Sequence, residues 1–288
     1  SVMRLLNNVH EVIQVGRPYK LASTSFKDKN TEIKVKDLVI GGKELAIIAG
    51  PDSAEYKEQT LDTAAAVSKS GGNGLRGGAF KPRTSPYSFQ GLGEEGLVLL
   101  KEAADINNLP LFSEIMDANH LEMMEDYVDV LQVGARNMQN FKLLEAVGES
   151  KLPVLLKRGL SATLEELLLA SEYILARGNE NVILCERGIR TFETKTRFTL
   201  DLCGVSYLKE YTNLPIILDT SHAMGYSYGV PDLTRACVAM GIDGLLIESH
   251  PNPIEAKSDA SQQLDFKEFR EMYESLLPIC EAVNRKII

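Results

Sequence analysis

The feature of this sequence that most constrains its fold is a repeated unit of one short apolar run, one polar turn and one amphipathic helical segment. Short apolar runs between helical segments are typical of parallel strands that are buried on both faces. Eight such runs occur from residue 46 onward: Ala46–Ala49, Gly74–Arg76, Pro110–Glu114, Val128–Gly134, Val154–Lys157, Val182–Glu186, Ile216–Asp219 and Gly244–Glu248. Eight units in about 240 residues predict an α/β protein with a closed (β/α)8 TIM barrel.

The segments between these runs have the apolar periodicity of helices, as in Ala54–Ser70, Glu94–Asn107, Thr163–Ala176 and Asp232–Gly241. An open, doubly wound sheet is the rival architecture for alternating strands and helices. That architecture usually carries the dinucleotide-binding motif G-x-G-x-x-G after its first strand, and this motif does not follow the first apolar run here. The barrel is therefore the preferred interpretation.

Residues 1–45 precede the repeat. Ile33–Ile40 alternates between apolar and polar residues, Gly41-Gly42 predicts a turn, and Glu44–Ile48 returns, which predicts a β-hairpin that closes the barrel floor. We expect residues 31–288 to form the barrel together with this hairpin. Residues 1–30 have the composition of a linker or of the stub of a missing domain.

Charge and cysteine usage narrow the possible partners and the compartment. The net charge of −9 argues against nucleic acid, although a local basic cluster can still bind anionic metabolites. No apolar stretch is long enough to span a bilayer, and no signal-peptide core is present, so we expect no membrane partner. The four scattered cysteines, at 185, 203, 237 and 280, are predicted to be buried free thiols, which fits the cytoplasm.

Charged or polar residues stand at the ends of nearly all the apolar runs. They are Asp52, Arg76, Glu114, Arg136, Lys157, Glu186, Arg187, His222 and Glu248. Active sites of TIM barrels lie at the carboxyl ends of the strands. We therefore expect these side chains to converge on one site.

One group within this set is basic: Arg76, Lys81, Arg83, Arg136, Lys157 and Arg187. Guanidinium groups match the oxygens of phosphate and carboxylate, and lysine adds a compact charge. So many cations in one cavity would repel one another unless anions enter it, which predicts a ligand with several negative charges. An ion pair with Glu114 or Glu186 is the alternative for single members of the group.

A second group consists of His222, Glu248 and Asp259, after the last two predicted strands. An imidazole and two carboxylates form a ligand set for a divalent metal. His250 lies two positions beyond Glu248 and is a possible alternative ligand, because side chains two apart on a strand point the same way. A hydrogen-bonded histidine–carboxylate pair without metal is equally compatible with this spacing.

Several longer motifs stand at and around the predicted strand ends. The longest is Leu75-Arg-Gly-Gly-Ala-Phe-Lys-Pro-Arg-Thr-Ser-Pro-Tyr-Ser-Phe-Gln-Gly-Leu92. The others are Gly134-Ala-Arg-Asn-Met-Gln-Asn140, Leu155-Leu-Lys-Arg-Gly159, Cys185-Glu-Arg-Gly-Ile-Arg-Thr-Phe-Glu193, Asp219-Thr-Ser-His-Ala223, Glu248-Ser-His-Pro-Asn-Pro253 and Ser258-Asp259. In this order they resemble the motifs of the 3-deoxy-D-arabino-heptulosonate 7-phosphate (DAHP) synthases of the core-barrel subfamily, and the resemblance runs from about residue 15 to residue 288.

This resemblance implies a transferase of the shikimate pathway, which makes aromatic amino acids. Phosphoenolpyruvate adds through C3 to the aldehyde of erythrose 4-phosphate, water attacks C2 and inorganic phosphate leaves. It implies a phosphoenolpyruvate site at Arg76, Lys81, Gly134, Ala135, Arg136, Lys157 and Arg187. Arg83 and Thr84 would hold the phosphate of the acceptor, and Glu114 would orient this set or handle water. The catalytic groups would be Lys81, Glu114, Lys157 and His222.

The resemblance also implies a divalent metal held by residues at positions 52, 222, 248 and 259. The family has Gly-Pro-Cys-Ser where this chain has Gly50-Pro51-Asp52-Ser53, so Asp52 replaces a cysteine ligand. A hard carboxylate favours Mn²⁺ or Mg²⁺ over the Zn²⁺ or Fe²⁺ that suit a thiolate, and we expect Mn²⁺. The family also usually has proline where Thr220 stands. We expect no regulatory domain of the kind that often precedes the barrel in this family, so feedback control by an aromatic amino acid is not assumed.

Three alternatives remain open. A sister enzyme uses arabinose 5-phosphate to make 3-deoxy-D-manno-octulosonate 8-phosphate, but its Lys-Ala-Asn-Arg-Ser-Ser motif differs from Lys81-Pro82-Arg83-Thr84-Ser85. A paralogue acting on a modified sugar would fit the changes at Asp52 and Thr220. A catalytically idle barrel that regulates a partner would not need so many cations. The resemblance further implies a homo-oligomer, a homotetramer or a homodimer.

Overall fold

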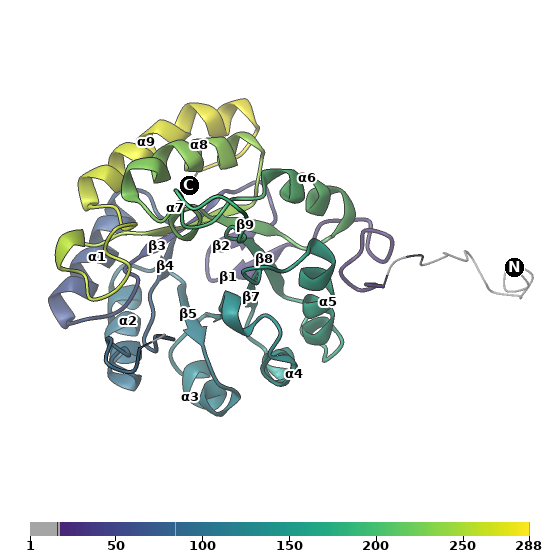
Figure 1. Cartoon of the computed structure of the whole chain (residues 1–288), viewed down its shortest axis with the longest axis horizontal. Coiled ribbons are helices and arrows are strands. Elements are labelled where there is room, and N and C mark those ends of the chain that lie inside the picture. The colour runs from purple at the N-terminus through teal and green to yellow at the C-terminus, as the bar shows by residue number, and fades with distance from the viewer. Residues whose placement is uncertain (1–15, 17, 84, 288) are drawn as a thin grey trace, which may run out of the picture.

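The computed structural model describes residues 16, 18–83 and 85–287. Its centre is a closed barrel of eight parallel strands in the order β10-β3-β4-β5-β6-β7-β8-β9, surrounded by helices (Figure 1). The predicted (β/α)8 barrel is therefore confirmed. The strands are β3 (Ala46–Gly50), β4 (Gly74–Arg76), β5 (Leu111–Ile115), β6 (Val130–Val133), β7 (Val154–Lys157), β8 (Val182–Glu186), β9 (Ile216–Asp219) and β10 (Gly244–Glu248).

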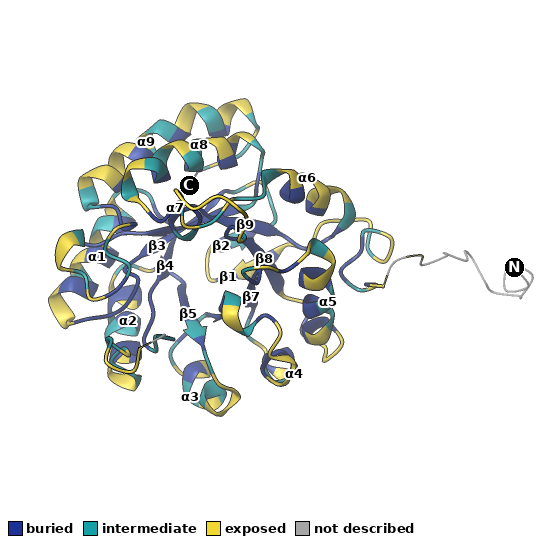
Figure 2. Cartoon of the chain, in the orientation of Figure 1, coloured by how far each residue is buried: buried dark blue, intermediate teal, exposed yellow. Residues whose placement is uncertain are grey.

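Helices cover the outside of the barrel, with their polar faces toward solvent and the strands buried inside (Figure 2). They are α1 (Lys57–Lys69), α2 (Glu94–Ile106), α3 (Leu121–Glu125), α4 (Phe141–Glu149), α5 (Leu164–Leu175), α6 (Leu202–Tyr211), α7 (Thr220–Met224), α8 (Val230–Ala239) and α9 (Phe266–Ala282). Thr163 and Asp265 begin α5 and α9 with capping boxes, in which each bonds reciprocally to a glutamate three residues later.

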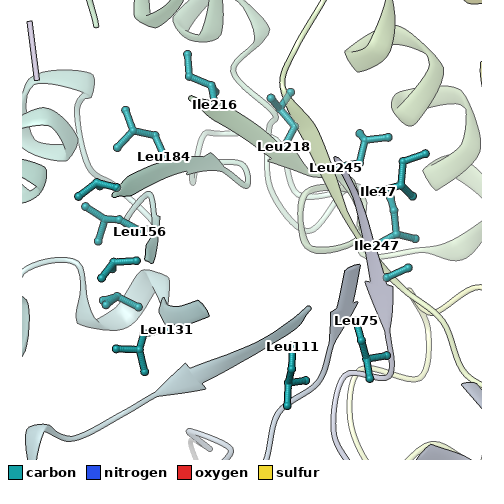
Figure 3. Close-up of a cluster of buried hydrophobic side chains, with 14 of the residues drawn as sticks. Ile47, Leu75, Leu111, Leu131, Leu156, Leu184, Ile216, Leu218, Leu245 and Ile247 are labelled. Carbon is teal, nitrogen blue, oxygen red and sulfur yellow. The ribbon is translucent and has the colours of Figure 1, made fainter. Parts of the chain in front are cut away.

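Alternate residues of each strand enter two separate apolar layers. One set points outward against the helices, and Figure 3 shows such side chains from all eight strands, among them Leu75, Leu131 and Leu184. The other set fills the barrel interior, which contains Ile48, Phe112, Val130, Leu155, Ile183, Ile217 and Leu246. Burial on both faces explains why the strands are almost continuously apolar in sequence.

The predicted floor hairpin is present, but its turn lies elsewhere than predicted. β1 (Ile33–Val35) pairs with β2 (Leu38–Ile40), and Lys36 makes the turn in a left-handed conformation, with φ of 53°. Gly41-Gly42 instead joins β2 to β3, so the predicted return segment is the first barrel strand. The hairpin buries its apolar side chains against the barrel interior, which closes the floor as expected.

Residues 18–31 pack against the outside of the barrel. Tyr19 and Ala22 belong to the outer apolar core, and Glu172 Oε1 accepts hydrogen bonds of 2.8 Å from the backbone N–H groups of Lys20 and Ala22. The assignment of residues 1–30 as a linker or stub stays a prediction, and residues 1–15 and 17 lie outside the described part.

Three of the four cysteines, at 185, 237 and 280, are buried, as predicted. Cys203 is exposed on α6, because it lies on the solvent face of that helix. Within the described ranges, no helix combines the length and the apolar character that a membrane crossing requires.

Candidate active site

A cavity of about 290 Å³ opens at the carboxyl ends of the barrel strands. Because parallel strands in a closed barrel all end on one face, residues far apart in sequence meet there. Eleven of the predicted site residues line it: Asp52, Lys81, Arg83, Glu114, Gly134, Ala135, Arg136, Lys157, Arg187, His222 and Asp259. The predicted convergence of strand ends is therefore present in the structure.

The four predicted metal ligands gather on one side of this cavity. Asp52, His222, Glu248 and Asp259 each offer one ligand atom, and these atoms all lie within 4.8 Å of one another. His222 Nε2 lies 3.4 Å from Glu248 Oε1 and 3.6 Å from Asp259 Oδ2. One imidazole nitrogen and three carboxylate oxygens form a donor set that could hold a divalent cation.

Asp219, the last residue of β9, fixes His222. Its Oδ1 caps α7 by accepting a hydrogen bond from the His222 backbone N–H. Its Oδ2 lies 2.7 Å from His222 Nδ1. A proton on Nδ1 would face this carboxylate and leave Nε2 free toward the cluster, the usual arrangement of a metal-binding histidine.

The crowding of carboxylates shows in their proton affinities. Burial, together with the negative charge of Asp52, raises the pKa of Glu248 to about 8. Burial also lowers the pKa of His222 to about 4, although Asp219 opposes this shift, so the imidazole is neutral at pH 7. A neutral imidazole beside buried carboxylates is suited to binding a cation.

Each carboxylate of this cluster also contacts a protein cation. Lys81 Nζ lies 2.6 Å from Asp52 Oδ1, and Arg76 lies 3.0 Å from Glu248 Oε1. Arg197 lies 3.1 Å from Asp259 Oδ2. Burial alone would raise the pKa of Asp52, but the charges of Lys81 and Arg76 outweigh it and hold the pKa well below its usual range.

The same cavity also carries cations with few acidic partners. Lys157 Nζ contacts Asp219 Oδ2 at 2.6 Å. Among the described residues, no carboxylate lies within ion-pair distance of Arg83, Arg136 or Arg187. Arg187 is only 4% exposed, stacks on the Phe198 ring at 4.0 Å and leaves its Nε without a hydrogen-bond partner. Burial lowers its pKa. A buried, unpaired guanidinium is stabilised when an anion enters.

Glu114, near the end of β5, also lines the cavity. Gln132 Nε2 donates a long hydrogen bond of 3.4 Å to its Oε2. A Cβ atom at Gly134 would lie 2.1 Å from Glu114 Oε1, so only glycine lets the carboxylate occupy this position. The Gly134-Ala135 backbone is thereby exposed to the cavity beside Arg136.

Some predicted residues take other positions. Arg76 lies beneath the main cavity, where it bonds Glu248 and the Pro51 carbonyl and lines a small adjoining space with Lys81 and Glu114. His250 does not join the metal cluster: β10 ends at Glu248, and the His250 Nε2 atom lies 3.7 Å from Glu55. Glu186 pairs with Arg158 at 2.8 Å and faces away from the other cations. Thr84 lies outside the described residues.

Three residues that frame the site were not predicted. Asp219 links Lys157 to His222, and it could have been found as the polar end of its apolar run. Arg197 and Phe198 lie in the long segment between β8 and α6, where no strand periodicity marks them. Their positions become evident only once this segment is folded over the cavity.

Comparison with known proteins shows close relatives along nearly the whole chain. The profile of the DAHP synthetase I family matches residues 26–283. A phospho-2-dehydro-3-deoxyheptonate aldolase of Thermotoga maritima is 46% identical over 282 residues, which are 98% of this chain and 83% of that protein. A 2-dehydro-3-deoxyphosphooctonate aldolase of Koribacter versatilis is 32% identical, over 87% of this chain and 96% of its own.

Solved structures agree with this relationship. The crystal structure of the Thermotoga maritima phospho-2-dehydro-3-deoxyheptonate aldolase (DAHP synthase) superposes with a TM-score of 0.93, over 99% of this chain and 84% of that one. A truncated form of 3-deoxy-D-arabino-heptulosonate 7-phosphate synthase from the same organism has a TM-score of 0.87 and 42% identity, over 93% of this chain and 98% of that one.

Proposed function

The chain belongs to the DAHP synthetase I family, and from this premise we propose that it condenses phosphoenolpyruvate with erythrose 4-phosphate and water to give DAHP and phosphate. This is the first step of the shikimate pathway. The observation that carries the proposal is one cavity that brings a metal-ligand cluster together with cations, among them Arg83, Arg136 and Arg187, that have no carboxylate partner among the described residues. Such a cavity suits two phosphorylated substrates, one of which carries a carbonyl.

The cations that line the cavity are suited to bind phosphoenolpyruvate, which carries a phosphate and a carboxylate. Lys157 and Arg187 are buried and would bind these groups in a water-poor environment, where charge-assisted hydrogen bonds are strongest. Arg136 and the Gly134-Ala135 backbone would complete the site. Arg76 would also contribute to this site, because its Nε has no hydrogen-bond partner, while its contact with Glu248 positions a metal ligand.

Asp52, His222, Glu248 and Asp259 would hold a divalent ion, and we expect Mn²⁺ because three of the four donors are carboxylates. When bound, the ion supplies Lewis-acid polarisation of the aldehyde oxygen. Asp219 orients His222 for this purpose. With Asp52 in place of a cysteine ligand, thiol oxidation at that position is no longer a route to inactivation.

The chain's own residues would manage the protons of the reaction. The new bond joins C3 of phosphoenolpyruvate to the aldehyde carbon, and the aldehyde oxygen takes a proton. Water adds to C2 and loses its proton to a base, and the C2–O bond to phosphate then breaks. Glu114 is the candidate base, because it stands beside the proposed phosphoenolpyruvate site. Lys157, held by Asp219, is the candidate to stabilise the departing phosphate.

Arg83 lies on the cavity wall next to Lys81 and would bind the phosphate of the acceptor, together with Thr84. We favour the four-carbon acceptor over arabinose 5-phosphate, because this chain is 46% identical to the heptonate enzyme and 32% identical to the octonate enzyme. Lys81-Pro82-Arg83 also differs from the motif expected for the longer sugar.

A phosphate-release assay with each aldehyde tests the proposal. We expect phosphoenolpyruvate-dependent release with erythrose 4-phosphate and much slower release with arabinose 5-phosphate. The reverse preference would identify the sister enzyme. Release with neither sugar would favour a paralogue with a modified acceptor, or an idle barrel.

The same preparation tests our expectation of a homotetramer or homodimer, through its mass in solution. We further propose a cytoplasmic location, where both substrates arise.

A further inference from the structure

The Asp52 carboxylate serves two groups with positive charge. It belongs to the four-residue cluster that could hold a metal ion, and its Oδ1 also contacts Lys81 Nζ at 2.6 Å. Lys81 further donates to the Asp52 carbonyl oxygen at 3.2 Å. A role for Lys81 in metal binding rests on the metal-dependent reaction proposed above.

The Asp52 carboxylate itself is fixed in place. Its Oδ2 accepts a hydrogen bond from the Ser258 hydroxyl, and that hydroxyl also contacts Ser53 Oγ at 2.8 Å. The Asp52 backbone N–H donates to Gln263 Oε1 at 3.1 Å. Ser258 and Gln263 thus hold the carboxylate in one orientation, with Oδ1 toward Lys81. An ion bound at Oδ1 would place its charge next to the Lys81 ammonium, which favours movement of the lysine.

Lys81 has the freedom to do so. Its ammonium ends a flexible four-carbon stem, and the side chain lines the cavity and is 11% exposed. The stem passes over Gly78, where a Cβ atom would lie 2.9 Å from Lys81 Cδ. Arg76, the cation nearest to Glu248, is more restrained, because one nitrogen contacts both Glu248 and the Pro51 carbonyl.

We propose that Lys81 acts as a displaceable counter-ion of Asp52: it occupies Oδ1 without a metal and gives up this oxygen when a divalent ion binds. Two cations at one carboxylate oxygen repel each other strongly in a buried site. The released ammonium lies on the cavity wall, where the phosphate of phosphoenolpyruvate offers it a new partner. Binding of the metal and of phosphoenolpyruvate should therefore strengthen each other, as linkage requires.

Titration with Mn²⁺ alone tests this idea, with free Mn²⁺ counted by electron paramagnetic resonance. Lys81→Met keeps the stem and removes the charge, and we expect it to tighten Mn²⁺ binding by about tenfold or more. Removal of any nearby positive charge would also tighten Mn²⁺ binding. The control is therefore Lys81→Met in an Asp52→Asn background, where Lys81 has no ion pair with position 52. In that background we expect Lys81→Met to change the affinity for Mn²⁺ by less than about threefold. Lys81→Gln replaces Lys81→Met in this test if Lys81→Met does not fold.

A second measurement repeats the titration with phosphoenolpyruvate and no aldehyde. Phosphoenolpyruvate should tighten Mn²⁺ binding several-fold in the parent and much less in Lys81→Met. Equal effects of Lys81→Met in both backgrounds, or an unchanged influence of phosphoenolpyruvate, would overturn the counter-ion role while the metal site stands. A parent that binds no Mn²⁺ and still releases phosphate in chelator would instead overturn the proposed metal dependence itself.

Discussion

The two ends of the barrel consist of the same eight strands, yet one end is lined by apolar side chains and the other by charged ones. At the floor, the β1–β2 hairpin and the strand interiors form a continuous apolar cluster that includes Ile48, Leu155 and Ile183. At the carboxyl ends, two residues further along several strands, the interior is charged. Lys157 follows Leu155 by two positions, and Asp219 follows Ile217 by two. The floor supplies stability, and the opposite end holds ion pairs together with cations, such as Arg187, that have no carboxylate partner among the described residues.

Metal removal should have the largest effect on activity, because the proposed metal ligands lie at the charged end of the barrel. We expect chelation to abolish phosphate release and added Mn²⁺ to restore it best among single ions, because the donor set is rich in carboxylate. The melting temperature should change far less than the activity, since the floor remains intact. Metal analysis of the purified protein accompanies this assay.

Two results would contradict that expectation. Full activity in chelator, with no bound metal, would mean that the cluster is not a metal centre. An inactive parent that regains activity on Asp52→Cys would show that Asp52 is a disabling substitution.

Lys157→Ala and Arg187→Ala should each lower kcat/KM by about a thousandfold, or several kcal/mol of transition-state stabilisation, because ligand charge is left unpaired in a closed site. Both side chains are about 4% exposed. Lys142→Ala is a matched control, since this lysine is exposed on α4 and pairs only with Glu145. Steady-state kinetics measure the effect. Activity within about threefold of the parent would remove the residue from the site.

Ile183→Ala should show the opposite signature at the floor. This fully buried side chain packs in the barrel interior, so the substitution should lower the free energy of unfolding by about 2–5 kcal/mol. Chemical denaturation measures this loss, and Ile183→Val should cost only about 0.5–1.5 kcal/mol. At temperatures where the variant is folded, its kcat/KM should stay close to that of the parent. A folded but inactive variant would show that packing at the floor also controls the active site at the opposite end.

Arg83→Ala should have the smallest and most selective effect. The side chain is only partly buried and would bind one phosphate, so we expect the KM for erythrose 4-phosphate to rise by about tenfold, with the KM for phosphoenolpyruvate nearly unchanged. Initial rates measured with one substrate varied at a time give both values. An equal rise for both substrates would show that Arg83 does not distinguish the acceptor site.

The sequence by itself determined the barrel, the number of its strands and the face on which the site lies. A strand buried on both faces must be apolar, and a charged residue at its end can only lie at the carboxyl face, so Lys157 and His222 could be placed without coordinates. Glu248 and Asp259 were expected as ligands because they follow the last strands, Asp52 followed from a family motif, and the structure brings all three together with His222.

Only the tertiary structure decided which way these side chains turn and what they contact. His250 leaves the barrel because β10 ends two residues earlier, so the alternation that would align it with Glu248 no longer applies. Arg76 is drawn beneath the cavity by Glu248, 172 positions away, and Asp52 meets Ser258 across 206 positions. Such contacts depend on closure of the barrel, which joins β10 to β3, and no local pattern in the sequence encodes their geometry.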